Sequence, residues 1–410
     1  MPRTHHVIVG GSIAGVSAAT AMRQHGYDGG ITVIDSEPPL PYERPPLSKP
    51  AAPERPTRPI FPAEHYAEQG IDLLLGTPVR RLDGDRRRVE LGDGQSLPAD
   101  QVLLATGVLC RSLGVPGEDL VGVHALRTAE NARKLFASLA HGGPLVVVGG
   151  GFIGLEVAAV ARTAGLDVTV VEAGEHPLQG PLGPAVARLV TRRHEARGVR
   201  IITRETVRCF TGSGAVEEVV LSGGRRLPAA TVVVGVGVRP NDRLAREAGV
   251  TCLDGIVVDR HGRTDRPWLW AAGDVASRTH PALAGRGRIE HWDAAMRHGQ
   301  SVGAGLAGRP STDSTTPYFW SDQYGTSLQM FGRAGSRDQV VLRSGASPER
   351  FLAYWLRGDR LVAVAGLGDP RAVRVARAVM EAGKPVSAQA LAEPATDLRQ
   401  LIRPGRRPGV

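Results

Sequence analysis

Cysteine is scarce in this chain, with three in 410 residues: Cys110, Cys209 and Cys252. No two of them form a C-x-x-C or C-x4-C pair, which argues against a disulfide framework and against a zinc or iron–sulfur site built by this chain. We therefore expect three buried small side chains, no bound metal, and a reducing cytoplasm as the location.

Long hydrophobic runs are also missing. Glycine or a charged residue interrupts each apolar stretch well before the roughly 20 residues that a membrane helix needs. A strand pattern begins within a few residues of Met1, so we expect neither a signal peptide nor a membrane span. With 42% hydrophobic residues, the composition is that of a globular protein of two or three domains.

Acidic residues are outnumbered, 41 against 50 basic ones, which gives a formal net charge of +9. We interpret the basic blocks at 80–81, 86–88 and 192–193 as solvated turns and helix faces. They lack the interleaved aromatics or known module of a nucleic-acid binder. A basic face that steers an acidic protein partner is the better interpretation. Residues 403–410 are expected to form a loose tail, and the oligomeric state stays open.

Glycine, in contrast, builds two fingerprints of the same layout that start 139 residues apart, at 7–15 and 146–154. Each follows an apolar run typical of a buried strand, and each opens a helical pattern. Such a turn rests a pyrophosphate on a helix N-terminus, where free N–H groups and the dipole favour an anion. The positions that need small residues are Gly10, Ser12 and Gly15 in the first and Gly149, Gly151 and Gly154 in the second.

Each fingerprint is followed by a second strand that ends in an acid. Asp35 lies 25 residues after Gly10, and Glu172 lies 23 residues after Gly149. Both are close to the spacing of about 20 that is typical of a carboxylate bonded to a ribose. Glu172 also favours NADH over NADPH, because a carboxylate accepts from the ribose hydroxyls and repels a 2′-phosphate.

The expected fold class is α/β: two nested Rossmann-like dinucleotide-binding domains plus a small C-terminal α+β domain. The boundaries are 1–111 with 242–317 for the first domain, 112–241 for the second and 318–410 for the third. The proline-rich stretch 38–62 is interpreted as a rigid loop, and residues 108–118 as loop-like. Helices are expected near 185–197, 294–306 and 372–382, and strands at 71–75, 89–91, 102–106, 199–203, 216–221, 231–238, 327–331, 340–343, 350–356 and 361–367.

The remaining motifs carry a resemblance. They are Pro41-Tyr-Glu-Arg-Pro-Pro-Leu-Ser-Lys49, Ala105-Thr-Gly107, Gly235-Val-Gly-Val-Arg-Pro-Asn241, Trp270-Ala-Ala-Gly-Asp274 and Glu290-His-Trp292. In this order they resemble the FAD- and NAD-dependent ferredoxin reductases of oxygenase systems, over nearly the whole chain. The resemblance implies the fold of the glutathione reductase superfamily. It also implies transfer of electrons from NADH through FAD to an acidic iron–sulfur ferredoxin that serves a cytochrome P450 or a Rieske-type oxygenase.

The resemblance also assigns residues. Lys49 and Glu156 would pair beside the flavin and stabilise its reduced form by fixed charge; the alternatives are a surface lysine and an acid favoured at a helix start. Trp320 would shape the nicotinamide pocket or the electron exit, or else belong to a core. The FAD residues are Gly10, Ser12, Ala14, Gly15, Asp35, Arg44, Lys49, Val79, Ala105, Thr106, Gly107, Arg127, Asp274 and Trp292. The NAD residues are Gly149, Gly151, Phe152, Ile153, Gly154, Glu172, Gly235, Val236 and Gly237.

One absence separates this chain from other members of that superfamily. Glutathione and lipoamide reductases pass electrons through two cysteines just after the first fingerprint, and here residues 38–50 contain none. A single-cysteine NADH oxidase or peroxidase is also disfavoured, because such an enzyme needs a thiol in the same stretch. Two alternatives stay open: a rubredoxin reductase or diaphorase, and a flavoprotein like apoptosis-inducing factor whose turnover is secondary.

Overall fold

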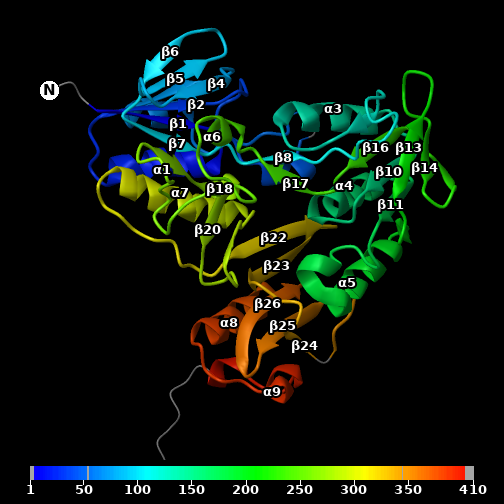
Figure 1. Cartoon of the computed structure of the whole chain (residues 1–410). Helices are drawn as coiled ribbons and strands as arrows, with labels where there is room; N and C mark the ends of the chain where they lie inside the picture. The colour runs from blue at the N-terminus through cyan, green and yellow to red at the C-terminus, as the bar shows by residue number, and fades with distance from the viewer. Residues whose placement is uncertain (1–3, 53–54, 344, 402–410) are drawn as a thin grey trace, which may run out of the picture. The chain divides into compact units, whose positions relative to one another are not determined.

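The computed structural model describes residues 4–52, 55–343 and 345–401. The chain divides into two compact units, each assembled from three separate segments (Figure 1). Unit 1 consists of Met1–Arg111, Arg127–Arg133 and Val238–Thr315. Unit 2 consists of Ser112–Leu126, Lys134–Gly237 and Thr316–Val410.

Unit 1 is built on a five-stranded parallel sheet of order β19-β7-β1-β2-β3. The strands are β1 (His5–Val9), β2 (Gly30–Ile34), β3 (Ile71–Leu74), β7 (Gln101–Leu104) and β19 (Leu269–Ala271). Alternate side chains of β1 enter two different cores. Val7 and Val9 pack with residues of the antiparallel sheet β4 (Val79–Asp83), β5 (Arg88–Leu91) and β6 (Ser96–Pro98), whereas Ile8 packs with the helices.

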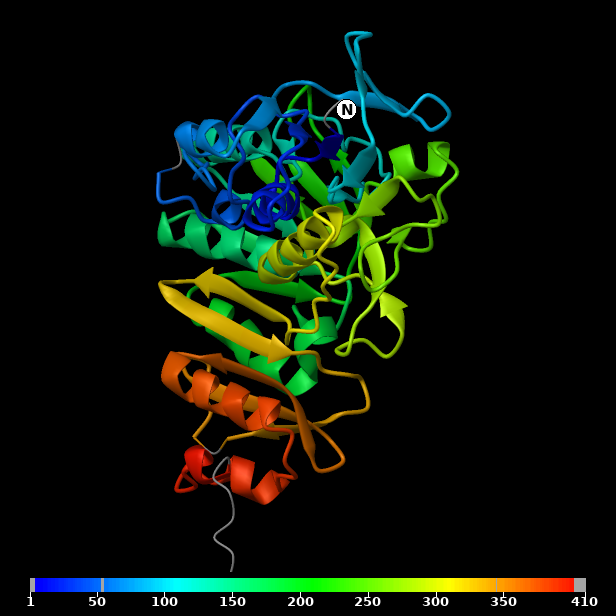
Figure 2. The ribbon, with the colours of Figure 1, turned by 90° about the vertical axis from the view of Figure 1, so that its left-hand side faces the viewer.

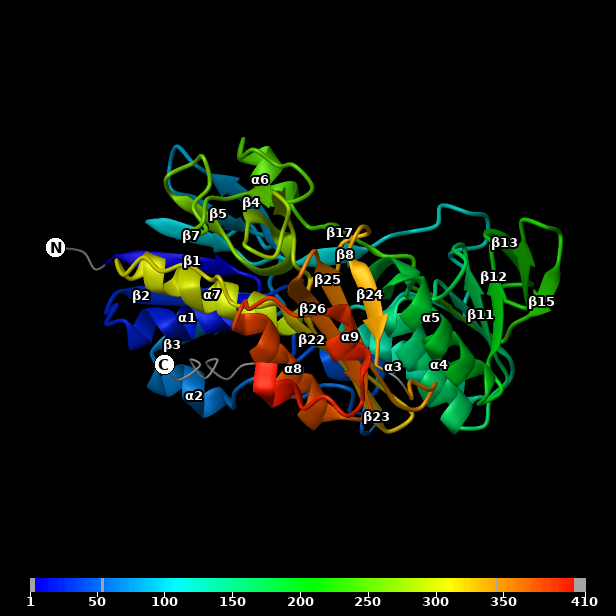
Figure 3. The same cartoon turned by 90° about the horizontal axis from the view of Figure 1, so that it is seen from below.

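Two helices cover the second face of this sheet. They are α1 (Ile13–Gln24) and α7 (Trp292–Leu306), which Figure 3 shows side by side. Glycine makes their contact possible: a Cβ on Gly299 would lie 2.2 Å from the carbonyl oxygen of Ala14, and one on Gly303 would lie 2.3 Å from that of Ala18. The tight packing holds α1, and with it the first glycine-rich turn, against the sheet.

Shorter elements complete unit 1. They are η1 (Pro45–Ser48), α2 (Ala63–Glu68), β8 (Val108–Cys110), β17 (Val238–Pro240), α6 (Arg243–Glu247), β18 (Ile256–Val257), η2 (Gly273–Val275), β20 (Ala276–Thr279) and β21 (Arg286–Gly287). Residues 108–118 were expected to be loop-like, and this expectation is wrong for β8, which pairs antiparallel with β17. The strand expected at 231–238 is likewise two strands, β16 (Thr231–Val234) and β17, interrupted at 235–237.

Unit 2 repeats the same architecture. Its parallel sheet has the order β12-β11-β10-β16-β9, and a three-stranded antiparallel sheet packs on one face. The remaining strands of the two sheets are β9 (Val123–His124), β10 (Leu145–Val148), β11 (Val168–Glu172), β12 (Arg200–Thr203), β13 (Val207–Thr211), β14 (Glu218–Leu221) and β15 (Arg226–Pro228). Its helices are α3 (Ala129–Ala140), whose first turn belongs to unit 1, α4 (Phe152–Thr163) and α5 (Gln179–Glu195).

The C-terminal part of unit 2 is an antiparallel sheet of order β22-β23-β26-β25-β24 with helix α8 packed against it (Figure 2). Its elements are β22 (Tyr318–Gln323), β23 (Thr326–Gly332), β24 (Gln339–Leu342), β25 (Phe351–Arg357), β26 (Arg360–Leu367), α8 (Pro370–Glu381), α9 (Ala388–Ala392) and η3 (Leu398–Leu401). The start of α8 is capped by Asp369, whose carboxylate accepts from the Ala372 N–H at 3.0 Å. The fold class expected from the sequence, α/β with parallel dinucleotide-binding sheets and a C-terminal α+β domain, is confirmed.

Several details differ from the expectations. The helix expected at 185–197 begins earlier, at Gln179, with a kink at Gly183. Arg193 is not solvated but 1% exposed. All three cysteines are half-buried, and none forms a disulfide. No helix among the described residues is long and apolar enough to cross a membrane, and residues 403–410 lie outside the described ranges.

Candidate functional site

The first glycine-rich turn joins β1 to α1 in a conformation that requires glycine. Gly10 has φ +116°, and a Cβ there would lie 2.3 Å from the carbonyl oxygen of Ala105 on the neighbouring strand exit. A Cβ on Gly15 would lie 2.0 Å from the carbonyl oxygen of Gly10. Ser12 is the N-cap of α1 but makes no side-chain cap bond, so its hydroxyl is not used to satisfy the helix start.

The second turn has the same construction between β10 and α4. Gly149 has φ +99°, and a Cβ there would lie 2.4 Å from the carbonyl oxygen of Gly235. A Cβ on Gly154 would lie 2.4 Å from the carbonyl oxygen of Gly149. Around Gly151, however, the Gly235 carbonyl oxygen at 3.9 Å is the only atom of the described residues within 4 Å of such a Cβ. Two glycines are thus needed for packing within the protein, and the middle one borders open space that fits an approaching pyrophosphate.

The two strand-end acids bind the turns that precede them. Asp35 accepts the Gly11 N–H at 2.6 Å through one oxygen and the Glu37 N–H at 2.9 Å through the other. Glu172 accepts the Gly150 N–H at 2.7 Å and the Gly174 N–H at 2.7 Å in the same way. Since a carboxylate oxygen can accept two hydrogen bonds, each acid keeps capacity for a ribose hydroxyl. Their ribose contacts stay a prediction, but their role in shaping the turns was missed from the sequence.

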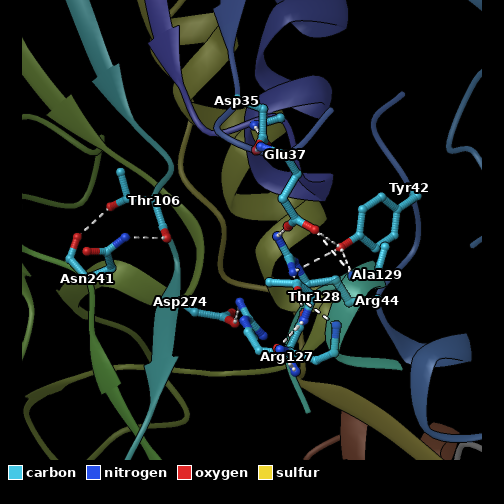
Figure 4. A network of polar contacts seen from close by, with 12 residues as sticks. Asp35, Glu37, Tyr42, Arg44, Thr106, Arg127, Thr128, Ala129, Asn241 and Asp274 are labelled. Carbon is cyan, nitrogen blue, oxygen red and sulfur yellow. Dashed lines mark hydrogen bonds and ion pairs between the residues drawn. The ribbon is translucent and has the colours of Figure 1, made fainter. Parts of the chain in front are cut away.

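A second cluster, also missed, surrounds Arg44 in the loop after β2 (Figure 4). The Arg44 guanidinium donates to Glu37 at 2.9 Å and to the carbonyl oxygen of Arg127 at 2.5 Å. The Tyr42 hydroxyl donates to the second oxygen of Glu37 at 2.6 Å and accepts the Ala129 N–H at 2.9 Å. Burial raises the pKa of Tyr42, so its hydroxyl stays a donor. The sequence placed Arg44 at the FAD but gave no signal that Glu37 and Tyr42 would bind the start of α3.

Asp274 follows β19 and is half-buried beside Arg127, whose guanidinium lies 3.8 Å from one carboxylate oxygen. The other oxygen is buried and has no hydrogen-bond partner among the described residues, and the same holds for Nε of Arg44. Burial raises the pKa of Asp274, and the cation of Arg127 opposes that rise. A buried acceptor and a buried donor without partners indicate that a polar ligand completes this site. The ribityl hydroxyls and pyrophosphate of FAD have the matching chemistry.

His298 on α7 supports the backbone before Asp274, a role that was also missed from the sequence. Its Nδ1 accepts the Gly273 N–H at 3.2 Å, directly before Asp274. The side chain is 2% exposed, and burial holds its pKa well below the usual value, so the ring is a neutral acceptor. Gly273 itself has φ +76°, which glycine adopts without strain, and the histidine fixes this backbone conformation.

Thr106 and Gly107, which follow β7, are hydrogen-bonded to Asn241, which follows β17. The Thr106 hydroxyl donates to the carbonyl oxygen of Asn241 at 2.7 Å, and the Asn241 N–H donates to Gly107 at 3.0 Å. Of the other predicted FAD residues, Ala14 lies in α1, Val79 begins β4, Lys49 follows η1 and Trp292 begins α7.

The predicted NAD residues all lie in unit 2. Phe152 packs edge-on against Phe319, with ring centroids 4.6 Å apart, whereas Ile153 is 43% exposed beside the turn. Gly235 and Val236 follow β16, and Gly237 has φ +99°. Trp320 stacks on Tyr318 with ring centroids 5.7 Å apart.

Glu156 lies just beyond the first turn of α4, so it is not the acid at a helix start that the alternative interpretation assumed, and it is 5% exposed. One of its oxygens accepts the Ser321 hydroxyl at 2.7 Å and the Asp322 N–H at 3.2 Å, both from β22. Because Lys49 belongs to unit 1 and Glu156 to unit 2, the expected pair of these two residues stays a prediction. The contacts with β22 were not expected.

The whole chain has known relatives. Rhodocoxin reductase of Rhodococcus erythropolis is 38% identical over 400 residues, 97% of this chain and 94% of that protein. The ferredoxin reductase component of chlorobenzene dioxygenase from Cupriavidus sp. (strain PS12) is 36% identical over 403 residues, 98% of each chain. The reductase in a crystal structure of the covalent putidaredoxin reductase–putidaredoxin complex is 33% identical, with a TM-score of 0.92 over 97% of this chain and 98% of that one.

Two family models match the chain, one over its two dinucleotide-binding sheets and one over its C-terminal part. A model described as reductase C-terminal matches residues 318–402. A model described as pyridine nucleotide-disulphide oxidoreductase matches residues 4–299, the part that carries both glycine-rich turns. The chain therefore belongs to the pyridine nucleotide-disulphide oxidoreductase family.

Proposed function

We propose that this protein is an NADH-dependent, FAD-containing ferredoxin reductase whose ferredoxin feeds a cytochrome P450 or Rieske-type oxygenase. The observation that carries the proposal is the presence of two dinucleotide turns of one construction, each with its own strand-end acid, in a chain without a cysteine pair. Its relatives are named as reductases of rhodocoxin, of a dioxygenase ferredoxin and of putidaredoxin. We place the protein in the cytoplasm and keep the three-domain division 1–111 with 242–317, 112–241 and 318–410.

FAD would be held by unit 1. The turn from Gly10 to Gly15 takes the pyrophosphate, Arg44 supplies a cation, and the unpartnered oxygen of Asp274 accepts from the ribityl chain. FAD supplies the chemistry that the side chains lack, because it accepts a hydride and releases single electrons. The protein would bind and orient the flavin and exclude water from it.

NADH would be held by unit 2, on the turn that precedes α4. Glu172 lies at the end of β11, where it would accept from the adenosine ribose, and the exposed Ile153 and the residues 235–237 border the same turn. Lys49 and Glu156 would stand beside the reacting ring atoms. A lysine cation there stabilises the negative charge of the reduced flavin.

The electrons would leave without a thiol relay. Residues 38–50 contain no cysteine, and the three that exist are half-buried and form no disulfide. An acidic ferredoxin carrying an iron–sulfur cluster would therefore take electrons from the flavin directly. Its approach would be favoured by the net charge of +9.

The test is an absorbance spectrum of the purified protein, an anaerobic NADH titration, and then addition of a [2Fe–2S] ferredoxin. The expected result is a flavin spectrum that NADH bleaches and that the ferredoxin restores while its own cluster is reduced. A colourless protein that FAD does not reconstitute, or bound flavin that NADH leaves oxidised, would contradict the proposal.

A further inference from the structure

Buried polar side chains form a continuous row in unit 2, from the turn between β22 and β23 to Glu156 on α4. The Tyr324 hydroxyl lies 2.9 Å from Nδ1 of His194, and Nε2 of the same ring lies 2.9 Å from Oε1 of Gln323. The Gln323 amide nitrogen lies 3.1 Å from the Ser321 hydroxyl, which lies 2.7 Å from Glu156. We call these five residues the Tyr324–Glu156 chain.

The carboxylate at one end fixes the direction of every bond in this chain. A carboxylate only accepts, so the Ser321 hydroxyl donates its single proton to Glu156. Ser321 must then accept from the amide N–H of Gln323, which leaves the Gln323 oxygen to accept. His194 therefore carries its proton on Nε2, and its Nδ1 accepts the Tyr324 hydroxyl. All four hydrogen bonds point toward Glu156.

The surroundings keep the chain in this state. Ser321 and His194 are both 0% exposed, and Gln323 is 4% exposed. Burial, opposed by the Gln323 hydrogen bond and reinforced by Arg193 and Arg197, lowers the pKa of His194 to about 4, so the ring is neutral near pH 7. Burial raises the pKa of Tyr324 to about 12, so its hydroxyl stays protonated. The direction of the bonds is thus constant across physiological pH.

The backbone of Tyr324 indicates that its side chain is needed. The residue has φ +52° in the tight turn that it forms with Gly325, a conformation that glycine or asparagine adopts at lower cost. The Arg197 guanidinium carbon lies 4.5 Å from the centroid of the Tyr324 ring, a cation–π contact made in addition to the bond with His194. We therefore explain a tyrosine at this left-handed position by the contacts that its side chain makes with His194 and Arg197.

We propose that Ser321, Gln323 and His194 are positioning residues for Glu156: Ser321 and Gln323 of β22 in the C-terminal domain, supported by His194 of α5, fix the orientation of the carboxylate beside the NAD-binding turn. A buried carboxylate is stable only when donors face it. Within α4 this acid lies two residues after Gly154, and the two donors from β22 orient it from outside the helix. The inference rests on the proposed function, because the role of Glu156 beside the nicotinamide belongs to it.

The first experiment uses the full-length holoprotein with Ser321→Ala. Loss of a hydrogen bond to a charged group predicts a fall of about tenfold or more in the rate of flavin reduction by NADH in stopped flow, with unchanged FAD content. Thr191→Val is the matched control: Thr191 is also buried on α5, but its hydroxyl bonds only to the carbonyl oxygen of Ala187. An unchanged rate in Ser321→Ala, or an equal fall in the control, would overturn the inference.

The second experiment asks whether His194 acts through Ser321. In a double-mutant cycle, the rate of His194→Leu/Ser321→Ala should equal that of Ser321→Ala alone, because in the Tyr324–Glu156 chain the Ser321 hydroxyl joins the Gln323 amide to the carboxylate. If His194→Leu does not fold, Gln323→Met breaks the chain one bond closer to Glu156 and replaces it in the cycle. Rate losses that multiply in the double variant would overturn a linked chain.

A third readout does not depend on activity. The carboxylate stretching band of Glu156, isolated as the infrared difference between wild type and Glu156→Gln, should shift in Ser321→Ala and not in Thr191→Val. If the wild-type flavin is not reduced by NADH, the proposed function fails while this band still decides the inference. If NADH reduces the wild type but neither rate nor band responds to Ser321→Ala, only the inference fails.

Discussion

At the scale of single residues, the sequence revealed the residues that are required by the local backbone conformation. Gly10 and Gly149 could be predicted because a tight turn against a neighbouring strand excludes a Cβ, and the structure places a carbonyl oxygen within 2.4 Å of each such Cβ. Glu37 and Tyr42 could not be predicted, because their partner is a backbone N–H more than 80 residues later. Arg193 was misjudged because an arginine pair on a helix usually faces water, whereas here its guanidinium is buried and donates to the carbonyl oxygen of Gln323.

Glu172 is the residue that should select the coenzyme. Its carboxylate accepts from ribose hydroxyls and repels the 2′-phosphate of NADPH. We predict flavin reduction by NADH to be at least about tenfold faster than by NADPH, the discrimination expected from one charge contact, and Glu172→Gln to narrow that ratio. Equal rates with both coenzymes in wild-type stopped-flow traces would remove this role.

His194 should make the protein sensitive to acid. Its folded pKa of about 4 lies below the unfolded value of 6.5, so the unfolded chain binds the proton more readily. The stability from the neutral ring is complete above pH 6.5 and is lost as the pH falls to about 4. The loss is on the order of 3 kcal/mol.

Urea unfolding at a series of pH values checks this, with His194→Gln as the comparison. The wild type should lose more unfolding free energy than the variant between pH 6.5 and 4. Parallel pH profiles would mean that the buried ring does not carry the effect.

At the scale of elements, strongly patterned segments were predictable and tertiary pairings were not. The strand at 168–172 and the helix near 372–382 match β11 and α8 to within two residues, because their apolar periodicity is local. β8 was missed because three residues after Gly107 become a strand only when β17 pairs with them from 128 positions away. The strand expected at 231–238 is interrupted at Gly235–Gly237, because β16 ends before these residues and β17 begins after them.

The contact between α1 and α7 offers an element-scale prediction. A Cβ on Gly303 would meet the Ala18 carbonyl oxygen at 2.3 Å, so Gly303→Ala should cost about 1–3 kcal/mol of unfolding free energy through overpacking. Because α1 carries the first turn, the variant should also release FAD more readily. Gly285→Ala is the control, since nothing lies within 4 Å of its Cβ; thermal unfolding and FAD fluorescence measure both. Equal stability of the two variants would contradict this packing.

At the scale of the whole molecule, one architecture occurs twice, a parallel sheet with an antiparallel sheet on one face, and a C-terminal domain is added to the second copy. Sequence reasoning reached this plan because both copies repeat the same fingerprint. It could not reach the Tyr324–Glu156 chain, whose members come from α4, α5, β22 and the β22–β23 turn and meet only in the folded unit.

The net charge of +9 leads to a prediction about the partner. If an acidic ferredoxin is steered by the field of the reductase, its second-order rate of reduction should fall steeply as salt rises from about 0.01 to 0.5 M, where the Debye length shrinks from about 30 Å to a few ångströms. NADH reduction of the flavin, measured in the same buffers, is the control and should change little. A flat profile for the ferredoxin would contradict steering.

The central claim is that electrons pass between two bound dinucleotides and on to a ferredoxin without any thiol. Replacing Cys110, Cys209 and Cys252 together by serine tests it most directly, with NADH-driven ferredoxin reduction as the measurement. We predict a rate within about twofold of wild type, because no thiol takes part in the transfer and the conservative replacement of a half-buried residue changes little. A variant that retains its FAD and its reduction by NADH but no longer reduces the ferredoxin would contradict the account.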